Sequence, residues 1–187
     1  MSGEVDLAVM LGGDVLAVAR RLLGMRIRTE WEGTPTEAML TEVEAYAGDQ
    51  DPASHAYRGR TGRNRAMFGP PGTLYVYRSY GLHWCMNIVT GPPATANAVL
   101  LRGGLPLVGE DAMVIRRRRR TNLADGPGKL TDALGVVGAH DGSSVLDGPV
   151  RLLAGSPPDG VTIIATPRIG ITKAADRPWR FVLVPAR

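Results

Sequence analysis

The sequence predicts a mixed α+β fold, and we expect residues 1–187 to form one domain. One segment has the residue spacing of an amphipathic helix, whereas several short runs of β-branched and aromatic residues are bounded by glycine or proline. The 24 glycines and 14 prolines also favour short elements joined by turns. A chain of 187 residues is long enough to bury a sizeable core without disulfides or metals.

The first predicted elements are a helix and a strand. Residues 14–23 carry apolar side chains at helical spacing, with Asp14 as the N-cap and Gly24 as the end of the helix. Residues 36–46 have the composition of a strand. Residues 48–71 are polar and rich in glycine and arginine, so we expect a long surface loop, and loops of that length are usually functional or disordered.

A β-hairpin is the clearest local structure in the sequence. Residues 73–78 and 84–90 are rich in β-forming side chains. The residues between them, Ser-Tyr-Gly-Leu-His at 79–83, include the glycine that a hairpin loop favours. We therefore expect these two strands to pair with each other.

The remaining predicted elements are short. Gly126, Pro127 and Gly128 form a turn, and a helix begins after it at residues 130–134. One more helix is expected at residues 110–120. Four more strands are expected at residues 98–102, 150–153, 161–166 and 180–184.

Two carboxylates and a phenol lie on one face of the predicted strand 36–46. Because strand side chains alternate, Glu42, Glu44 and Tyr46 share a face, and Val43 lies on the other. Two glutamates at alternate positions are usually a solvated strand face. If this face is buried in a cleft, desolvation and like charge would raise a carboxyl pKa and suit the group to acid–base chemistry. The spacing leaves both interpretations open.

Three of the five tyrosines lie in the predicted hairpin. Tyr75 and Tyr77 share one strand face, and core strand aromatics explain them equally well. Tyr80 lies at the expected tip beside Gly81, where an aromatic ring would project into solvent. Aromatic side chains at such positions can fill the gap that a flipped nucleotide leaves in DNA.

The chain is basic, with a formal net charge of +4, which permits a phosphate-containing partner. Only Lys129 and Lys173 among its 22 cationic residues are lysines, and genome composition can explain that bias. Candidates for a phosphate groove are Arg58, Arg60, Arg63, Arg65, Arg78, Asn87 and Arg102. The run Arg116–Arg120 would point around most of a helix and suits the helix dipole, so we interpret it as a solvated helix end.

Several classes of site do not fit the composition. Cys85 is the only cysteine, so neither an internal disulfide nor a cysteine-based zinc cluster can form. The three histidines lack the spacing of a metal motif, and no glycine-rich phosphate loop is present, so we expect no metal and no nucleotide hydrolysis. The chain start carries acidic Glu4 and Asp6, and no apolar run reaches roughly 18 residues, so we expect a cytoplasmic protein with no membrane partner.

A series of motifs is spread over most of the chain. The first four are T-E-V-E-A-Y at 41–46, D-x-A-S-H at 51–55, R-N-R-A-M-F at 63–68 and P-G-T-L-Y-V-Y-x-x-Y-G-x-x-x-C-M-N at 71–87. They continue with V-L-L-R at 99–102, G-P-G-K-L at 126–130, R-I-G-I at 168–171 and R-P-W-R-F at 177–181. In this order they closely resemble the alkyladenine (3-methyladenine) DNA glycosylase family.

The resemblance implies an enzyme of base excision repair that flips a damaged purine out of duplex DNA and hydrolyses its N-glycosidic bond. Its fold would be one α/β domain around a curved antiparallel sheet, with the hairpin protruding into the minor groove. Glu44 would activate the attacking water, and Arg102 would help to hold that water. Tyr80 would be the intercalating wedge.

The base pocket would be walled by Tyr46, His55 and Tyr77, with Asn87 at its edge as a selector. DNA backbone contacts are expected at Arg60, Arg63, Arg65 and Lys129. The expected partner is double-stranded DNA with damaged purines, and we expect a monomer without a cofactor, associated with the nucleoid if the source is bacterial. Because neither lysine lies near the Glu44 motif, we expect no Schiff-base lyase step.

Two other classes of function remain open. A non-catalytic binder of distorted DNA would keep the wedge but release no base. A carbohydrate hydrolase could use Glu42 and Glu44 as its carboxylate pair, because alternate strand positions are about 7 Å apart at the backbone.

Overall fold

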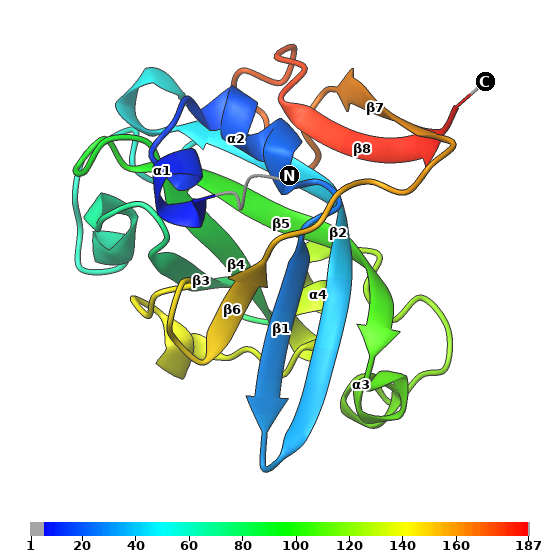
Figure 1. Cartoon of the computed structure of the whole chain (residues 1–187). Helices are drawn as coiled ribbons and strands as arrows, with labels where there is room; N and C mark the ends of the chain where they lie inside the picture. The colour runs from blue at the N-terminus through cyan, green and yellow to red at the C-terminus, as the bar shows by residue number, and fades with distance from the viewer. Residues whose placement is uncertain (1–5, 187) are drawn as a thin grey trace.

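An eight-stranded sheet, antiparallel throughout, is the frame of the molecule (Figure 1). The computed structural model describes residues 6–186. The strands are β1 (Arg26–Trp31), β2 (Thr34–Ala47), β3 (Leu74–Ser79), β4 (His83–Thr90), β5 (Asn97–Val108), β6 (Val150–Leu153), β7 (Val161–Thr166) and β8 (Arg180–Pro185). Their order is β3-β4-β5-β2-β1-β6, and β8 pairs with both β2 and β7.

Strand β2 is where the sheet bends. Its 14 residues pair with β5 along one edge, and with β1 and then β8 along the other. The register with β5 shifts beside Ala38 and on both sides of Glu42. Such bulges bend a strand and increase its twist. The sheet therefore curls into a half-barrel, which confirms the curved antiparallel sheet expected from the sequence.

Helices cover parts of this sheet. Within residues 6–186 they are α1 (Leu7–Leu11), α2 (Val15–Leu22), α3 (Glu110–Arg117) and α4 (Pro127–Ala133), with 3-10 turns at Gly48–Gln50, Arg65–Phe68 and Gly138–His140. Helix α2 packs against β2 and β5, and α4 packs against β4, β5 and α3. As predicted, the Asp14 carboxylate caps α2 by accepting hydrogen bonds from two backbone N–H groups.

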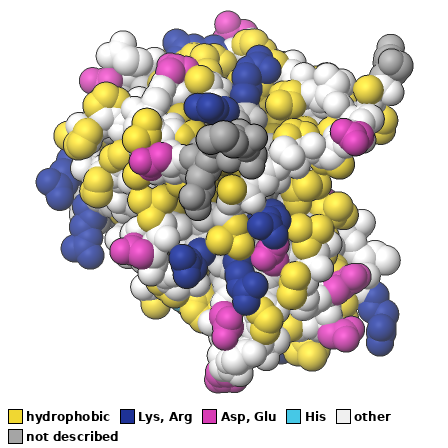
Figure 2. Space-filling model, in the orientation of Figure 1, with side chains coloured by type: hydrophobic (Ala, Val, Ile, Leu, Met, Phe, Trp, Pro, Cys, Tyr) yellow, Lys and Arg dark blue, Asp and Glu magenta, His cyan; other side chains and the backbone are white. Residues whose placement is uncertain are grey.

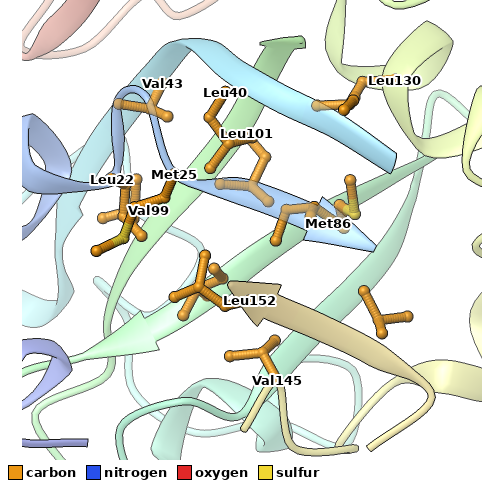
Figure 3. Close-up of a cluster of buried hydrophobic side chains, with 14 of the residues drawn as sticks. Leu22, Met25, Leu40, Val43, Met86, Val99, Leu101, Leu130, Val145 and Leu152 are labelled. Atoms are coloured by element: carbon orange, nitrogen blue, oxygen red, sulfur yellow. The ribbon is translucent and has the colours of Figure 1, made fainter. Parts of the chain in front are cut away.

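Two apolar clusters use alternate residues of the strands. On β3, Leu74 and Val76 enter the larger cluster, whereas Tyr75 and Tyr77 belong to the smaller one. In the larger cluster, side chains from α2, β2, β4, β5, α4 and β6 meet (Figure 3). Val43 of β2 enters it as well, so the face of β2 that carries the carboxylates is turned away from the main core.

The predicted hairpin is confirmed. Strands β3 and β4 pair from Leu74 opposite Ile88 to Ser79 opposite His83. By contrast, α1 and β1 were not predicted. In β1 only Ile27 and Thr29 are buried, and charged residues alternate with them, so the strand lacks an apolar signal.

The predicted helix at residues 110–120 is too long, because α3 ends at Arg117 and Arg118 adopts a left-handed φ of 51°. The interpretation of the whole arginine run as a solvated helix end is wrong for its first two residues. Arg116 donates hydrogen bonds to β2 and α4, and Arg117 pairs with a carboxylate of α4. Only Arg118–Arg120 are exposed.

Two further sequence expectations concern membranes and the chain start. No helix in the described part of the chain is long and apolar enough to cross a membrane. Of the two acidic residues noted at the start, Asp6 caps α1, and Glu4 lies outside the described residues.

Candidate active site

A cavity of about 400 Å³ opens on the face of the sheet opposite the main core, between the β3–β4 hairpin and residues 169–171. Residues from β2, β3, β4 and β5, the first residue of α4, the 3-10 turn Arg65–Phe68 and the neighbouring loops line it. The predicted site residues among them are Tyr46, His55, Arg63, Tyr77, Tyr80, Asn87 and Arg102. The structure thus brings together side chains that are up to 56 positions apart in the sequence.

Glu44 lies directly behind the wall of this cavity. Its side chain is fully buried, and its carboxylate is held by three residues that do line the cavity. Oε1 accepts a hydrogen bond of 2.7 Å from the Ile169 N–H and lies 3.4 Å from Arg102 Nη1, and Oε2 accepts a hydrogen bond of 2.8 Å from the Tyr46 hydroxyl. A buried carboxylate that accepts two hydrogen bonds and pairs with an arginine is fixed in place.

Arg102 reaches the cavity because it sits in a β-bulge. In the pairing of β2 with β5, Glu42 lies opposite Gly103 and Val43 lies opposite Leu101, so Arg102 has no partner of its own. Bulges commonly re-aim a side chain beside an active site. Here the bulge directs the guanidinium to the carboxylate face of β2.

Glu42 holds the other side of the same guanidinium. Its Oε1 accepts a hydrogen bond of 2.7 Å from Arg102 Nε and another of 2.7 Å from Arg180 Nε. Burial alone would raise the pKa of Glu42, but the hydrogen bonds and charges of Arg180 and Arg102 outweigh it and lower the pKa. Glu42 is therefore ionised, and it is part of the site rather than a solvated strand residue.

Tyr46 contributes both a hydroxyl and a ring face. Burial and the neighbouring Glu44 charge raise the pKa of Tyr46, so the hydroxyl stays protonated and donates a hydrogen bond to the Glu44 carboxylate. The Arg168 guanidinium lies 4.6 Å from the centre of its ring. The ring is therefore held between the cavity and a buried cation.

Arg168 is itself fixed by Asp51 in a fully buried ion pair. Both nitrogens at the end of the guanidinium donate to the two Asp51 oxygens, and one of them also donates to the Ala45 carbonyl at 2.9 Å. Bidentate pairs of this kind fix geometry as well as charge. Because Ile169 follows Arg168, the pair positions the N–H group that binds Glu44.

Three aromatic rings form the opposite part of the cavity. Tyr75 and Tyr77 are stacked with centroids 5.4 Å apart, and His55 meets Tyr77 edge-on at 4.6 Å. The Tyr75 hydroxyl is hydrogen-bonded to His55 Nδ1 at 2.9 Å. Desolvation and the charge of Arg63 lower the pKa of His55, so the imidazole is neutral at neutral pH.

Asn87 and Cys85 complete the β4 side of the cavity. Asn87 is buried and donates through Nδ2 to the Tyr75 carbonyl at 3.1 Å, which fixes its amide. Burial raises the pKa of the Cys85 thiol, which therefore does not act as a thiolate nucleophile. Within residues 6–186, no group of three or more His, Cys, Asp or Glu side chains could hold a metal ion.

Tyr80 projects from the end of the hairpin and is 91% exposed. Tyr80 and Gly81 both have positive φ, at 50° and 70°, and the Leu82 N–H closes the turn on the Ser79 carbonyl. Two central residues with positive φ are typical of the tight turns that join hairpin strands. The turn thus holds an aromatic ring in solvent at the rim of the cavity.

The predicted phosphate-binding residues differ in their surroundings. Arg60, Arg63 and Arg65 are exposed, and of these only Arg63 lines the cavity, where it donates to the Arg78 carbonyl at 3.1 Å. Lys129 follows the cavity residue Pro127 by two positions and pairs with Asp125. On the face shown in Figure 2, basic side chains are interspersed with acidic and apolar ones rather than forming one continuous surface.

Sequence reasoning missed three contributors to the site. Asp51 and Arg168 are separated by 117 positions, and no local pattern joins them. The Ile169 N–H is a backbone group, so the identity of the residue does not predict that it binds Glu44. Strand alternation did predict that Glu42 shares a face with Glu44, but it did not predict the ion pairs of Glu42 with Arg102 and Arg180.

Comparison with known proteins places these observations in one family. The family model described as methylpurine-DNA glycosylase matches residues 10–186. A protein of Frankia casuarinae assigned as a 3-methyladenine DNA glycosylase is 50% identical over 182 residues, covering 90% of this chain and 84% of the relative. One of Methanoculleus marisnigri with the same assignment is 48% identical over 179 residues, covering 93% and 92%.

Proposed function

Because the chain belongs to the methylpurine-DNA glycosylase family, we propose that it is a monofunctional DNA glycosylase that excises alkylated or otherwise damaged purines from duplex DNA. The observation that carries the proposal is the placement of Glu44. Its carboxylate is buried behind the wall of an aromatic cavity and is held by a backbone N–H, an arginine and a phenol. The substrate base would occupy the cavity after it is flipped out of the stack.

Glu44 would act on the water that attacks the anomeric carbon. A carboxylate has about four acceptor positions, and the two hydrogen bonds to Glu44 together with the Arg102 contact at Oε1 would leave one at Oε2 for a water proton. Breaking an N-glycosidic bond develops oxocarbenium character on the sugar. The negative charge of Glu44 would stabilise that character, and the carboxylate would take the proton as the C–O bond forms and the C–N bond breaks.

The aromatic walls would favour alkylated purines over undamaged ones. An N-alkylated purine carries a positive charge, which stacks favourably on electron-rich rings such as Tyr46 and Tyr77. The same charge makes the base a good leaving group that departs without a proton from the enzyme. Neutral His55 offers a hydrogen-bonding edge without adding a competing cation to the pocket.

Tyr80 would fill the gap left by the flipped nucleotide, and Arg60, Arg63, Arg65 and Lys129 would contact phosphates. A lyase step is not part of the proposal, because neither lysine lines the cavity and Schiff-base formation needs an amine at the reacting carbon. We expect the protein to act as a monomer without a cofactor.

The ion pairs of Glu42 argue against the carbohydrate-hydrolase alternative. An acid in such a carboxylate pair needs a raised pKa so that it can give a proton to the leaving group. Arginines instead lower the pKa of Glu42. Glu42 therefore does not suit the role of the acid in such a pair.

The test is a set of duplexes that each contain one N-methylpurine, ethenoadenine or hypoxanthine. Abasic sites are measured as strand breaks after alkali treatment, with Glu44→Gln as the matched control. We expect abasic sites with the wild type on at least the cationic base, and no strand breaks before alkali. Equal yields from wild type and Glu44→Gln would contradict the catalytic assignment, and tight binding without base release would favour the non-catalytic binder.

A further inference from the structure

We propose that Glu42 is a positioning residue, which sets the place of the Arg102 guanidinium beside Glu44. The inference rests on the proposed function and adds to it a residue that does not touch the reacting atoms. Three observations carry it: the bulge at Arg102, the unequal contacts of that arginine with the two carboxylates, and the sharing of Glu42 with Arg180.

The bulge leaves Arg102 without a neighbour opposite it on β2. Its side chain therefore depends on other contacts to hold it in one conformation, and a long arginine side chain has many rotamers to lose. Gly103 provides the space for the Glu42 contact, because a Cβ at that position would lie 3.1 Å from Glu42 Cβ and 3.2 Å from Thr41 Oγ1. The local backbone thus brings the glutamate and the arginine together.

Glu42, rather than Glu44, makes the closer contact with this arginine. Arg102 Nε is 2.7 Å from Glu42 Oε1, whereas Arg102 Nη1 is 3.4 Å from Glu44 Oε1. The Glu44 oxygen already accepts the Ile169 N–H at 2.7 Å. The guanidinium is therefore anchored at Nε by Glu42 and presents its far end to Glu44 and the cavity.

Arg180 offers a competing explanation for Glu42. Its Nε donates to the same Oε1, and its Nη1 donates to Thr166 Oγ1 at 3.0 Å, so this arginine ties Glu42 to β7 and β8. If Glu42 acted only through Arg180, its role would be to hold the C-terminal strands on β2. The experiment must therefore separate an effect through Arg102 from one through Arg180.

The test combines Glu42→Ala with single-turnover base release and with the Kd for lesion duplex. We expect Glu42→Ala to slow release by about tenfold or more while Kd changes by less than about twofold, as for residues that orient a group beside the reaction. In an Arg102→Ala background, adding Glu42→Ala should change the rate by less than about twofold, because the group it positions is gone. Arg180→Ala should stay within about threefold of the wild-type rate.

Two further variants protect the test against loss of folding. Glu42→Met keeps the length of the side chain but has no charge and only a weak hydrogen-bond acceptor, so it should show the same slow release. Glu37→Ala is the matched control: Glu37 lies on the same strand and pairs with Arg26 at 2.9 Å, and it does not line the cavity. We expect Glu37→Ala to lower the thermal midpoint and to leave the rate unchanged.

Each contrary result has a distinct meaning. If the wild type releases base and Glu42→Ala or Glu42→Met does so at the same rate, the inference is wrong and the proposed function stands. It is also wrong if Arg180→Ala reproduces the slow release. The same holds if Glu42→Ala slows base release as much in the Arg102→Ala background as it does in the wild type. If the wild type releases no base from any duplex, the proposed function fails, and this inference fails with it.

Discussion

Two parts of the site are built in opposite ways. One is the buried group of charges behind the cavity, Glu44, Asp51 and Arg168, which we call the wall, and the other is the tip of the hairpin. In the wall, Glu44, Asp51 and Arg168 are buried, and each charged group is held by several hydrogen bonds. At the tip, Tyr80 is 91% exposed, and Leu82 is 72% exposed. The wall therefore depends on the rest of the fold for its geometry, whereas the tip depends only on a turn.

This difference leads to different expectations for function. Groups that act on a reacting bond gain from burial, because charges interact more strongly away from water and do not need to reorganise. A side chain that fills a gap in DNA must be exposed before binding. We expect changes in the wall to affect stability and the rate of base release, and changes at the tip to affect affinity alone.

The largest effect on stability should come from Asp51→Ala. The substitution leaves the Arg168 guanidinium buried without its partner, and breaking a buried ion pair on one side costs about 3–5 kcal/mol. Urea unfolding measures the loss. Asp125→Ala, which breaks the exposed pair with Lys129, should cost less than about 1 kcal/mol. Equal costs for the two would remove the distinction between the wall and the surface.

The same ion pair predicts a dependence on acid. Burial alone would raise the pKa of Asp51, but the hydrogen bonds and charge of Arg168 outweigh it, so the folded pKa lies below the unfolded value of about 3.9. The contribution to stability is therefore complete above about pH 4 to 5 and is lost as the pH falls through the folded pKa. The wild type should lose more stability than Asp51→Asn between pH 5 and pH 2, measured by urea unfolding; parallel losses would contradict this.

Tyr80→Ala tests the tip. Loss of one stacked ring should weaken binding to lesion duplex by about 5- to 100-fold, while binding to single strands changes far less. The thermal midpoint should not move, because the ring is 91% exposed and buries little area in the folded protein. Leu82→Ala, at the same turn, serves as the control and should have a smaller effect. Equal losses on duplex and single strand would contradict the wedge.

The smallest effect is expected from a single phosphate contact. Arg65→Ala should reduce the slope of log K against log salt by about one and leave discrimination between lesions unchanged. Arg119→Ala removes an exposed arginine from the segment after α3 and should not change the slope. Fluorescence anisotropy at several salt concentrations measures both, and a slope change for Arg119→Ala alone would reverse the assignment.

The tip could be predicted from the sequence, and much of the wall could not. The glycine in the turn and the β-rich runs beside it are local signals, so the hairpin and the exposure of Tyr80 follow from a few neighbouring residues. Strand alternation also predicts that Glu42 and Glu44 share a face. Whether that face is buried depends on segments far along the chain, such as Arg168 and Arg180, which no local pattern joins to β2.

The two wrong predictions from the sequence, at β1 and at the arginine run, also come from contacts between distant segments. Strand β1 escaped prediction because its charged residues pair across the sheet with β2, and that pairing replaces the apolar pattern of an isolated strand. The arginines at the end of α3 resemble a solvated run, yet Arg116 and Arg117 contact α4. In both segments, contacts with residues far away in the sequence determine the structure, and local composition does not predict those contacts.

The most direct test of the account compares Glu44→Gln with Tyr80→Ala on one duplex that contains a cationic N-methylpurine, with both the single-turnover rate at saturating protein and the Kd. We expect Glu44→Gln to lower the rate by about 100-fold or more, because a general base contributes at least that much, while Kd stays within about threefold. Tyr80→Ala should weaken binding instead. A Glu44→Gln protein that releases base at the wild-type rate would contradict the central claim.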